Sequence, residues 1–204
     1  ARALENFPLS NRKVNNELIK AYGMVKLTCS LTNASIGVWE DTVKQDAIIK
    51  ASTELSEGKL SDHILVDSLQ GGAGTSTNMN ANEVIANIAL VYMGKEKGEY
   101  DYCHPNNHVN LSQSTNDSYP TAVKIALKNS SITLNKELKL LVDSFKAKAE
   151  EFKGILKMGR TQLQDAVPMT LGQEFGAFAT TLEEEIKRIN RNADLLLSVN
   201  MGAT

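Results

Sequence analysis

The feature that constrains this fold most is an apolar periodicity near the end of the chain. Apolar residues recur there every 3 or 4 positions, at Leu171, Phe175, Phe178, Leu182, Ile186, Ile189, Ala193 and Leu196. This near-heptad spacing predicts one long helix of about seven turns, which would begin near Pro168. Residues 117–152 predict a second long helix with its own apolar face. Two such helices belong in a bundle, and further sequence or other subunits must cover their seam.

Shorter helices are predicted in the first half of the chain. Apolar residues from Val14 to Cys29 follow one helical face, which Ser10 could cap. Residues 39–55 and 82–93 have the pattern of two more helices, whereas glycine and proline break up residues 95–110 into a loop. We therefore predict a mainly α fold. An N-terminal helical domain, residues 1–113, precedes the first long helices of a central helix bundle, residues 114–204.

Composition excludes several classes of protein. Hydrophobic residues make up 42% and charged residues 23%, as in an ordinary globular domain. The net charge of -2 gives no electrostatic reason to expect binding to nucleic acid or to an anionic membrane. We expect no membrane span, because no apolar run approaches about 20 residues, and no secretory signal. Cys29 and Cys103 lie far apart, so we expect two free thiols in a reducing cytoplasm.

Three segments are rich in small polar residues: 71–83 ("GGAGTSTNMNANE"), 112–117 ("SQSTND") and 157–174 ("KMGRTQLQDAVPMTLGQE"). The first lacks the lysine of a phosphate-binding P-loop, and Thr77 breaks the dinucleotide fingerprint. Taken alone, each segment has the composition of a capped turn that leads into a helix. Taken together, they offer neutral hydrogen-bond donors beside helix ends, which would suit a small dicarboxylate. Both interpretations remain open on these grounds.

The histidines do not form a convincing metal site. His104 and His108 are four residues apart, but Pro105 disfavours a helix that would bring them together, and no carboxylate lies within the span. A structural role is the simpler interpretation. The chain has no GxSxG motif, so it gives no support for a serine hydrolase.

Three long blocks of the sequence resemble the aspartase/fumarase superfamily: "GGAGTSTNMNANEVIAN", "HPNNHVNLSQSTNDSYPTA" and "KMGRTQLQDAVPMTLGQEF". They are most similar to aspartate ammonia-lyases, because Gln162 in "GRTQLQDA" occupies the position where fumarases have a histidine. The resemblance implies reversible deamination of L-aspartate to fumarate and ammonia, through β-proton abstraction and an enediolate-like intermediate. Class II fumarase activity and a non-catalytic helical assembly fragment are the alternatives.

The resemblance also implies a set of substrate-binding residues, namely Thr75, Ser114, Thr115, Asn116, Thr161 and Gln162. In the family these come from different subunits of a homotetramer. No metal ligand and no required cofactor are implied, and divalent-metal activation stays open. The base is a serine on a loop that we expect downstream of Thr204, so no catalytic residue is assigned here and the isolated chain is expected to be inactive. Members of the family usually have an aspartate in "PNDHVN" where this chain has Asn107. Whether this region forms a second dicarboxylate site therefore stays open.

Overall fold

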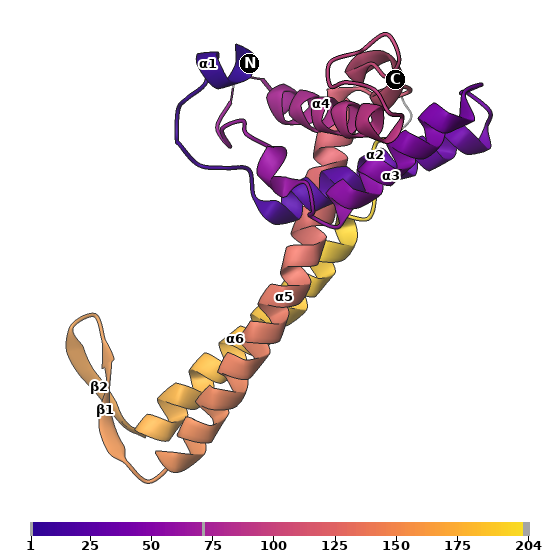
Figure 1. Cartoon of the computed structure of the whole chain (residues 1–204). Helices are drawn as coiled ribbons and strands as arrows, with labels where there is room; N and C mark the ends of the chain where they lie inside the picture. Colours follow the sequence, from indigo (N-terminus) through magenta and orange to yellow (C-terminus); the bar gives the residue numbers. More distant parts are fainter. Residues whose placement is uncertain (1, 71, 202–204) are drawn as a thin grey trace. The chain divides into compact units, whose positions relative to one another are not determined.

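The computed structural model describes residues 2–70 and 72–201, and it confirms a mainly α fold (Figure 1). Gly71 of the first polar segment and residues 202–204 of the predicted second domain lie outside the described residues. The chain forms two compact units. We call the residues up to Leu127, with those from Leu197 on, the N-terminal unit, and Lys128–Leu196 the hairpin unit. The helices are α1 (Arg2–Asn6), α2 (Asn16–Ser35), α3 (Thr42–Ser56), α4 (Thr75–Tyr92), α5 (Thr115–Glu151) and α6 (Leu171–Leu195).

The N-terminal unit has a continuous apolar core. Helices α2, α3 and α4 pack against one another, and they bury side chains such as Ile48, Ile85 and Leu90 completely. Gly23 allows α2 to approach the end of α3 closely, because a Cβ atom at this position would lie 2.1 Å from the backbone nitrogen of Ser56. This unit therefore has the buried apolar surface that stabilises a small globular domain.

The prediction that Ser10 caps the helix containing Val14 and Cys29 is wrong. Asn15 caps α2 and accepts a hydrogen bond from the backbone N–H of Glu17. The backbone N–H of Ser10 donates instead to Asp67 at 2.7 Å, and the Ser10 hydroxyl contacts the same carboxylate. These hydrogen bonds lower the pKa of Asp67 to about 2, and the hydrogen bond from the Ser10 hydroxyl has the largest effect. An isolated bridge between Lys13 and Asp67 completes this link between two distant segments.

Two segments of the N-terminal unit are more helical than their composition indicates. Helix α4 begins at Thr75 rather than at residue 82, because Thr77 and Asn78 are buried polar residues that an apolar pattern does not detect. Pro105–Val109 forms one turn of π-helix within the segment predicted as loop, and Ser61–His63 forms a short 3-10 helix. At the starts of α4 and of the π-helical turn, Gln70 Oε1 and His104 Nδ1 accept hydrogen bonds from the backbone N–H groups of Thr77 and Asn106.

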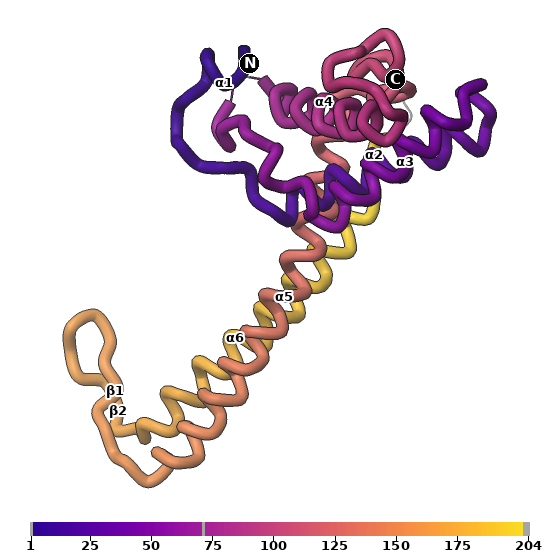
Figure 2. Tube along the Cα trace, in the orientation of Figure 1, coloured from indigo at the N-terminus to yellow at the C-terminus, as the bar shows by residue number. Residues whose placement is uncertain are grey.

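The hairpin unit contains the second part of α5 and all of α6, which run side by side (Figure 2). Polar contacts join the two helices along their length, as between Asn135 and Asn190 at 2.7 Å. Phe175 of α6 makes edge-to-face contacts with Phe145 and Phe152, with ring centroids 5.8 and 5.3 Å apart. The prediction of a long helix over residues 117–152 is confirmed by α5.

The connection between α5 and α6 differs from the predicted loop and helix start. Strands β1 (Leu156–Thr161) and β2 (Gln164–Thr170) form an antiparallel hairpin, and Pro168 lies in β2. Helix α6 therefore begins at Leu171, where Thr170 and Gln173 form a capping box. Proline is compatible with this two-stranded hairpin because both of its strands are edge strands.

Candidate functional site

The first polar segment supplies the N-terminus of α4. Gly74 precedes the helix in a left-handed conformation (φ 83°), and a Cβ atom here would overlap the ring of Tyr119. Gln70 fixes the first turn, since its amide oxygen accepts from the Thr77 N–H at 2.8 Å and its amide nitrogen donates to the Thr77 hydroxyl at 2.7 Å. Thr75 is the first residue of α4 and is exposed. A helix N-terminus with an exposed hydroxyl favours an anionic ligand.

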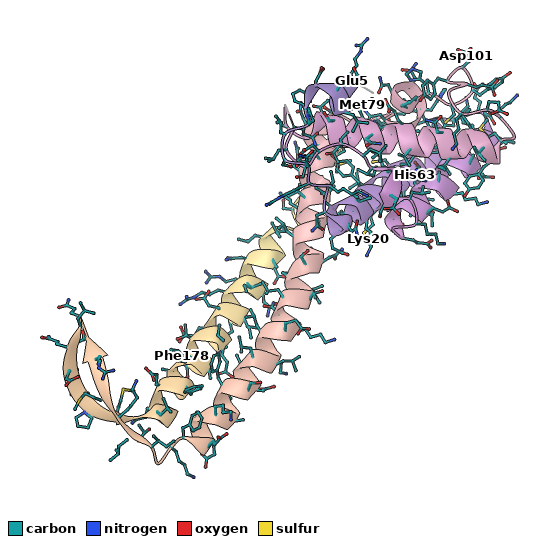
Figure 3. All side chains as sticks on the ribbon, turned by 60° about the vertical axis from the view of Figure 1, so that its left-hand side comes forward. Glu5, Lys20, His63, Met79, Asp101 and Phe178 are labelled. Carbon is teal, nitrogen blue, oxygen red and sulfur yellow. The ribbon has the colours of Figure 1, made fainter. Side chains whose placement is uncertain are left out.

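A cavity of about 610 Å³ lies beside this N-terminus. Thr75, Ser76, Met79 (labelled in Figure 3) and Asn80 line it from α4. Arg2 and Glu83 line it as well, so the lining carries one positive and one negative charge. The sequence analysis missed Arg2, because a single arginine in "ARALENF" carries no local pattern that indicates a ligand.

The second polar segment forms the start of α5. The backbone N–H of Ser114 donates to Asp117 at 3.0 Å, and the backbone N–H of Asn116 donates to the Ser114 hydroxyl at 3.2 Å. Asn78 of α4 donates through Nδ2 to the Thr115 hydroxyl at 3.0 Å. Ser114 and Thr115 are half-buried, and Asn116 is exposed. The structure thus joins the first and second segments directly, through Asn78 and Thr115.

A buried lysine, Lys26, is linked to Asn78 through the side chain of Asn110. The Nζ atom of Lys26, on α2, donates to Asn110 Oδ1 at 3.0 Å and to Gln113 Oε1 at 2.8 Å, and its side chain is fully buried. Burial lowers the pKa of Lys26 to about 7, against smaller opposing effects of Cys29 and Asp117.

The sequence analysis did not single out Lys26, although the pattern of α2 contains a signal. Steps of 3 or 4 residues along the buried face pass from apolar to polar side chains, through Ile19, Tyr22, Lys26, Ser30 and Asn33. Polar residues within an otherwise apolar helical stripe indicate a buried polar network.

The third segment belongs to the hairpin unit. Thr161 pairs with Gln164, so Gln162 and Leu163 form a two-residue turn between β1 and β2. Both turn residues have positive φ angles, 48° and 65°, as in a type I′ turn, which favours asparagine and glycine. Thr161 and Gln162 are exposed. Of the predicted site residues, Thr75, Ser114, Thr115 and Asn116 are therefore in the N-terminal unit, whereas Thr161 and Gln162 are in the hairpin unit.

The two histidines of the second block have structural contacts. The backbone N–H of His104 donates to His108 Nδ1 at 2.7 Å, and His104 Nδ1 accepts from the backbone N–H of Asn106 at 3.0 Å. Burial, followed by the charge of Lys44, lowers the pKa of His108. Within residues 2–70 and 72–201, no group of three or more potential metal-ligating side chains comes together. No helix in these same ranges is long and apolar enough to cross a bilayer.

Comparison with known proteins supports the resemblance that the three sequence blocks indicated. The chain is 51% identical to the aspartate ammonia-lyase of Bacillus sp and 52% identical to that of Escherichia coli (strain K12), in both cases over its whole length. It spans 43% of the length of each relative. Its fold superposes on a fumarate lyase:delta crystallin structure from Brucella melitensis with a TM-score of 0.92 and 49% identity, over 98% of this chain and 47% of that one.

A class II fumarase from Schistosoma mansoni is also similar, with a TM-score of 0.86 and 32% identity, over 97% of this chain and 42% of that one. The sequence profile of a family described as lyase matches residues 1–204. The match covers the whole chain and confirms the resemblance that the three blocks indicated, so the chain belongs to this lyase family.

Proposed function

We propose that the whole protein containing this chain is an aspartate ammonia-lyase, which converts L-aspartate reversibly to fumarate and ammonia. The observation that carries the proposal is an identity of 51% and 52% to two aspartate ammonia-lyases over the whole length of the chain. Gln162 supports the choice of ammonia-lyase, since fumarases have a histidine at this position. The chain spans only 43% of those relatives, so the activity is assigned to the whole protein.

The proposed mechanism depends on fixed neutral donors. Removal of the β-proton places negative charge on the β-carboxylate, and donors aimed at that carboxylate stabilise the enediolate-like intermediate. The hydroxyls of Thr75 and Thr115 suit this role, because they donate hydrogen bonds and do not titrate near neutral pH. Arg2, which lines the cavity beside Thr75 together with Glu83, offers a charged donor to a substrate carboxylate. The proposal assigns the base to no serine of this chain.

We propose that Ser114, Asn116, Thr161 and Gln162 complete the substrate-binding set. Thr161 and Gln162 belong to a different unit from the others, which is compatible with sites shared between subunits of a homotetramer. The hairpin unit also leaves large apolar side chains exposed, among them Leu134 at 50% and Phe178 at 47%. Other subunits or further sequence would bury these side chains.

The proposal extends to domain division and location. We keep 1–113 and 114–204 as the domains, supported by the start of α5 at Thr115. We place the protein in the cytoplasm, where the free thiols of Cys29 and Cys103 would stay reduced.

Turnover of the whole protein tests the proposed reaction. Fumarate absorbs in the ultraviolet, so incubation with L-aspartate is expected to raise the absorbance and release ammonia in equal amounts. Activity with malate and none with aspartate would instead establish class II fumarase, which the likeness to the Schistosoma mansoni structure keeps as the second candidate. Absence of turnover with either substrate would instead support the remaining alternative, a non-catalytic helical assembly protein.

Substitution of Thr115 tests the proposed binding wall. Thr115→Val keeps the shape and removes the hydroxyl, so the substrate carboxylate loses a donor. We expect kcat/KM for aspartate to fall roughly 10- to 100-fold. Thr115→Ser retains the hydroxyl and is the matched control, with a much smaller loss. Equal kinetics of Thr115→Val and the unsubstituted enzyme would remove Thr115 from the site.

A further inference from the structure

In the buried polar network around Asn110, the donor and acceptor of each hydrogen bond can be assigned by starting from Lys26. A protonated lysine can donate hydrogen bonds but cannot accept them. The atoms that face Nζ at 3.0 and 2.8 Å, in Asn110 and Gln113, must therefore be the amide oxygens. Both amide nitrogens donate on their other side to backbone carbonyls, Asn110 Nδ2 to Gln113 O at 3.0 Å and Gln113 Nε2 to Val109 O at 3.0 Å. Lys26 on the oxygen side and these carbonyls on the nitrogen side therefore set the orientation of both amides together.

The oxygen of Asn110 transmits this direction to α4. Asn110 Oδ1 also accepts from Asn78 Nδ2 at 3.2 Å and from Asn82 Nδ2 at 3.1 Å. An oxygen that can only accept requires the nitrogen of Asn78, not its oxygen, on this side. Ser118 does not fix Asn78 independently, since its single hydroxyl hydrogen has two acceptors, Asn78 Oδ1 at 3.2 Å and Ser114 O at 2.8 Å. The orientation of Asn78 therefore depends on Asn110.

The final step reaches a proposed substrate-binding hydroxyl. Asn78 Nδ2 also donates to Thr115 Oγ1 at 3.0 Å, so this hydroxyl accepts from within the protein. Its own hydrogen is then free to point toward a ligand. If Asn78 turned its oxygen to Thr115, the hydroxyl would donate to that oxygen, and a substrate carboxylate would meet lone pairs instead of a hydrogen.

We propose that Lys26 is a positioning residue that, through Asn110 and Asn78, keeps the Thr115 hydroxyl oriented as a hydrogen-bond donor to the dicarboxylate. This inference rests on the proposed function and deepens it. Lys26 itself is fully buried and acts only through the residues between it and Thr115. Lys26 keeps this direction in both protonation states, because its charged form has no lone pair and its neutral form still has two N–H hydrogens for the two amide oxygens.

A double-mutant cycle in the whole protein tests this coupling. Lys26→Met removes the donor, and kcat/KM for aspartate is expected to fall roughly 10-fold or more. In the Thr115→Val background the same substitution is expected to change kcat/KM less than about threefold, because the oriented hydroxyl is already absent. A purely structural role would lower kcat/KM equally in both backgrounds, and that outcome would overturn the proposal. Lys20→Met is the matched control on α2, where the side chain is 38% exposed (Figure 3).

Asn78→Asp provides a second route if Lys26→Met does not fold. A carboxylate at this position can only accept, so Thr115 must donate to it and is lost as a donor to substrate. We expect kcat/KM for aspartate to fall by a similar factor, and we expect no further fall in the Thr115→Val background. An equal fall of kcat/KM in that background would refute the inference.

Calorimetric binding of fumarate, measured on the same variants, separates this inference from the proposed function. Absence of aspartate turnover by the unsubstituted protein would contradict the proposed function alone. The fumarate binding constants of the unsubstituted protein, Lys26→Met, Thr115→Val and the double variant would then decide the coupling. Non-additive losses of affinity would support it, and additive losses would overturn it.

Discussion

The two units of this chain use apolar residues in opposite ways. The N-terminal unit buries a continuous set of them, and it also encloses a polar network of which Lys26 and Asn82 are fully buried. Among the described residues of the hairpin unit, the buried apolar side chains are Val142, Ala179 and Ala193. The first unit thus has the interior of a domain, whereas the second leaves large apolar side chains such as Leu134 and Phe178 exposed.

This difference separates two kinds of residue in the proposed substrate-binding set. Ser114 and Thr115 are positioned by contacts inside their own unit, so their geometry is set locally. Gln162 lies instead in a strained two-residue turn with its side chain exposed. Positioning of a residue at such a turn requires further contacts, because strained backbone persists only where the surroundings over-determine it.

Equivalent glycine substitutions are expected to affect the two units in opposite directions. In α2, Gly23→Ala places a Cβ atom 2.1 Å from the backbone of Ser56, so we expect a loss of about 3 kcal/mol in the free energy of unfolding. In α6, the nearest atom to a Cβ on Gly176 is 3.9 Å away, so Gly176→Ala is expected to gain about 0.5 to 1 kcal/mol from helix propensity. Urea unfolding measures both values.

The single tryptophan distinguishes the units in this experiment. Trp39 packs against the core of the N-terminal unit, so its fluorescence reports that unit, while circular dichroism reports helices of both. Gly23→Ala should lower the midpoint by fluorescence, and Gly176→Ala should leave it unchanged. A Gly23→Ala protein of full stability would mean that α2 and α3 do not approach closely in solution.

The contrast also explains what the sequence could predict. The long helices were predictable because apolar periodicity marks them, and α5 agrees with residues 117–152 to within two residues. The start of α4 and the hairpin of β1 and β2 were not, because Asn78 and Thr77 are buried through hydrogen bonds, and Pro168 suggested a helix start. The polar segments indicated a ligand only collectively, since side-chain composition does not reveal which donors meet in space.

The buried ammonium of Lys26 is expected to make stability depend on pH in the N-terminal unit. Its pKa is about 7 in the folded chain, against the ordinary lysine value of 10.5 in the unfolded chain. Between these values the unfolded chain binds more protons, so stability rises with pH by about 1.4 kcal/mol per pH unit. The destabilisation is fully present below pH 7 and absent above 10.5. Unfolding at pH 8 and pH 9, followed by Trp39 fluorescence, should show this rise relative to Lys26→Met.

A lysine of the hairpin unit is the control for that pH dependence. Lys146 is 53% exposed, and its hydrogen bond with Glu183 raises its pKa above the ordinary value. Folded and unfolded chains therefore hold the same proton on Lys146 at pH 8 and pH 9, and Lys146→Met should leave the slope unchanged. A slope that survives in Lys26→Met would assign the pH dependence to another group.

The last expected effect concerns the turn of the hairpin unit. Leu163 is fully exposed and has a φ of 65°, a conformation that costs a residue with a Cβ about 1 to 2 kcal/mol and costs glycine little. Leu163→Gly is therefore expected to stabilise the hairpin by about 1 kcal/mol, which is about fivefold greater protection of the β1 and β2 amides from hydrogen exchange. Leu156→Gly is the matched control, because this residue of β1 is 80% exposed and has no positive φ. It should lower protection, since glycine weakens an ordinary strand. Equal losses of protection in both variants would mean that the turn carries no strain, and Gln162 would then need no neighbouring contacts to hold its place.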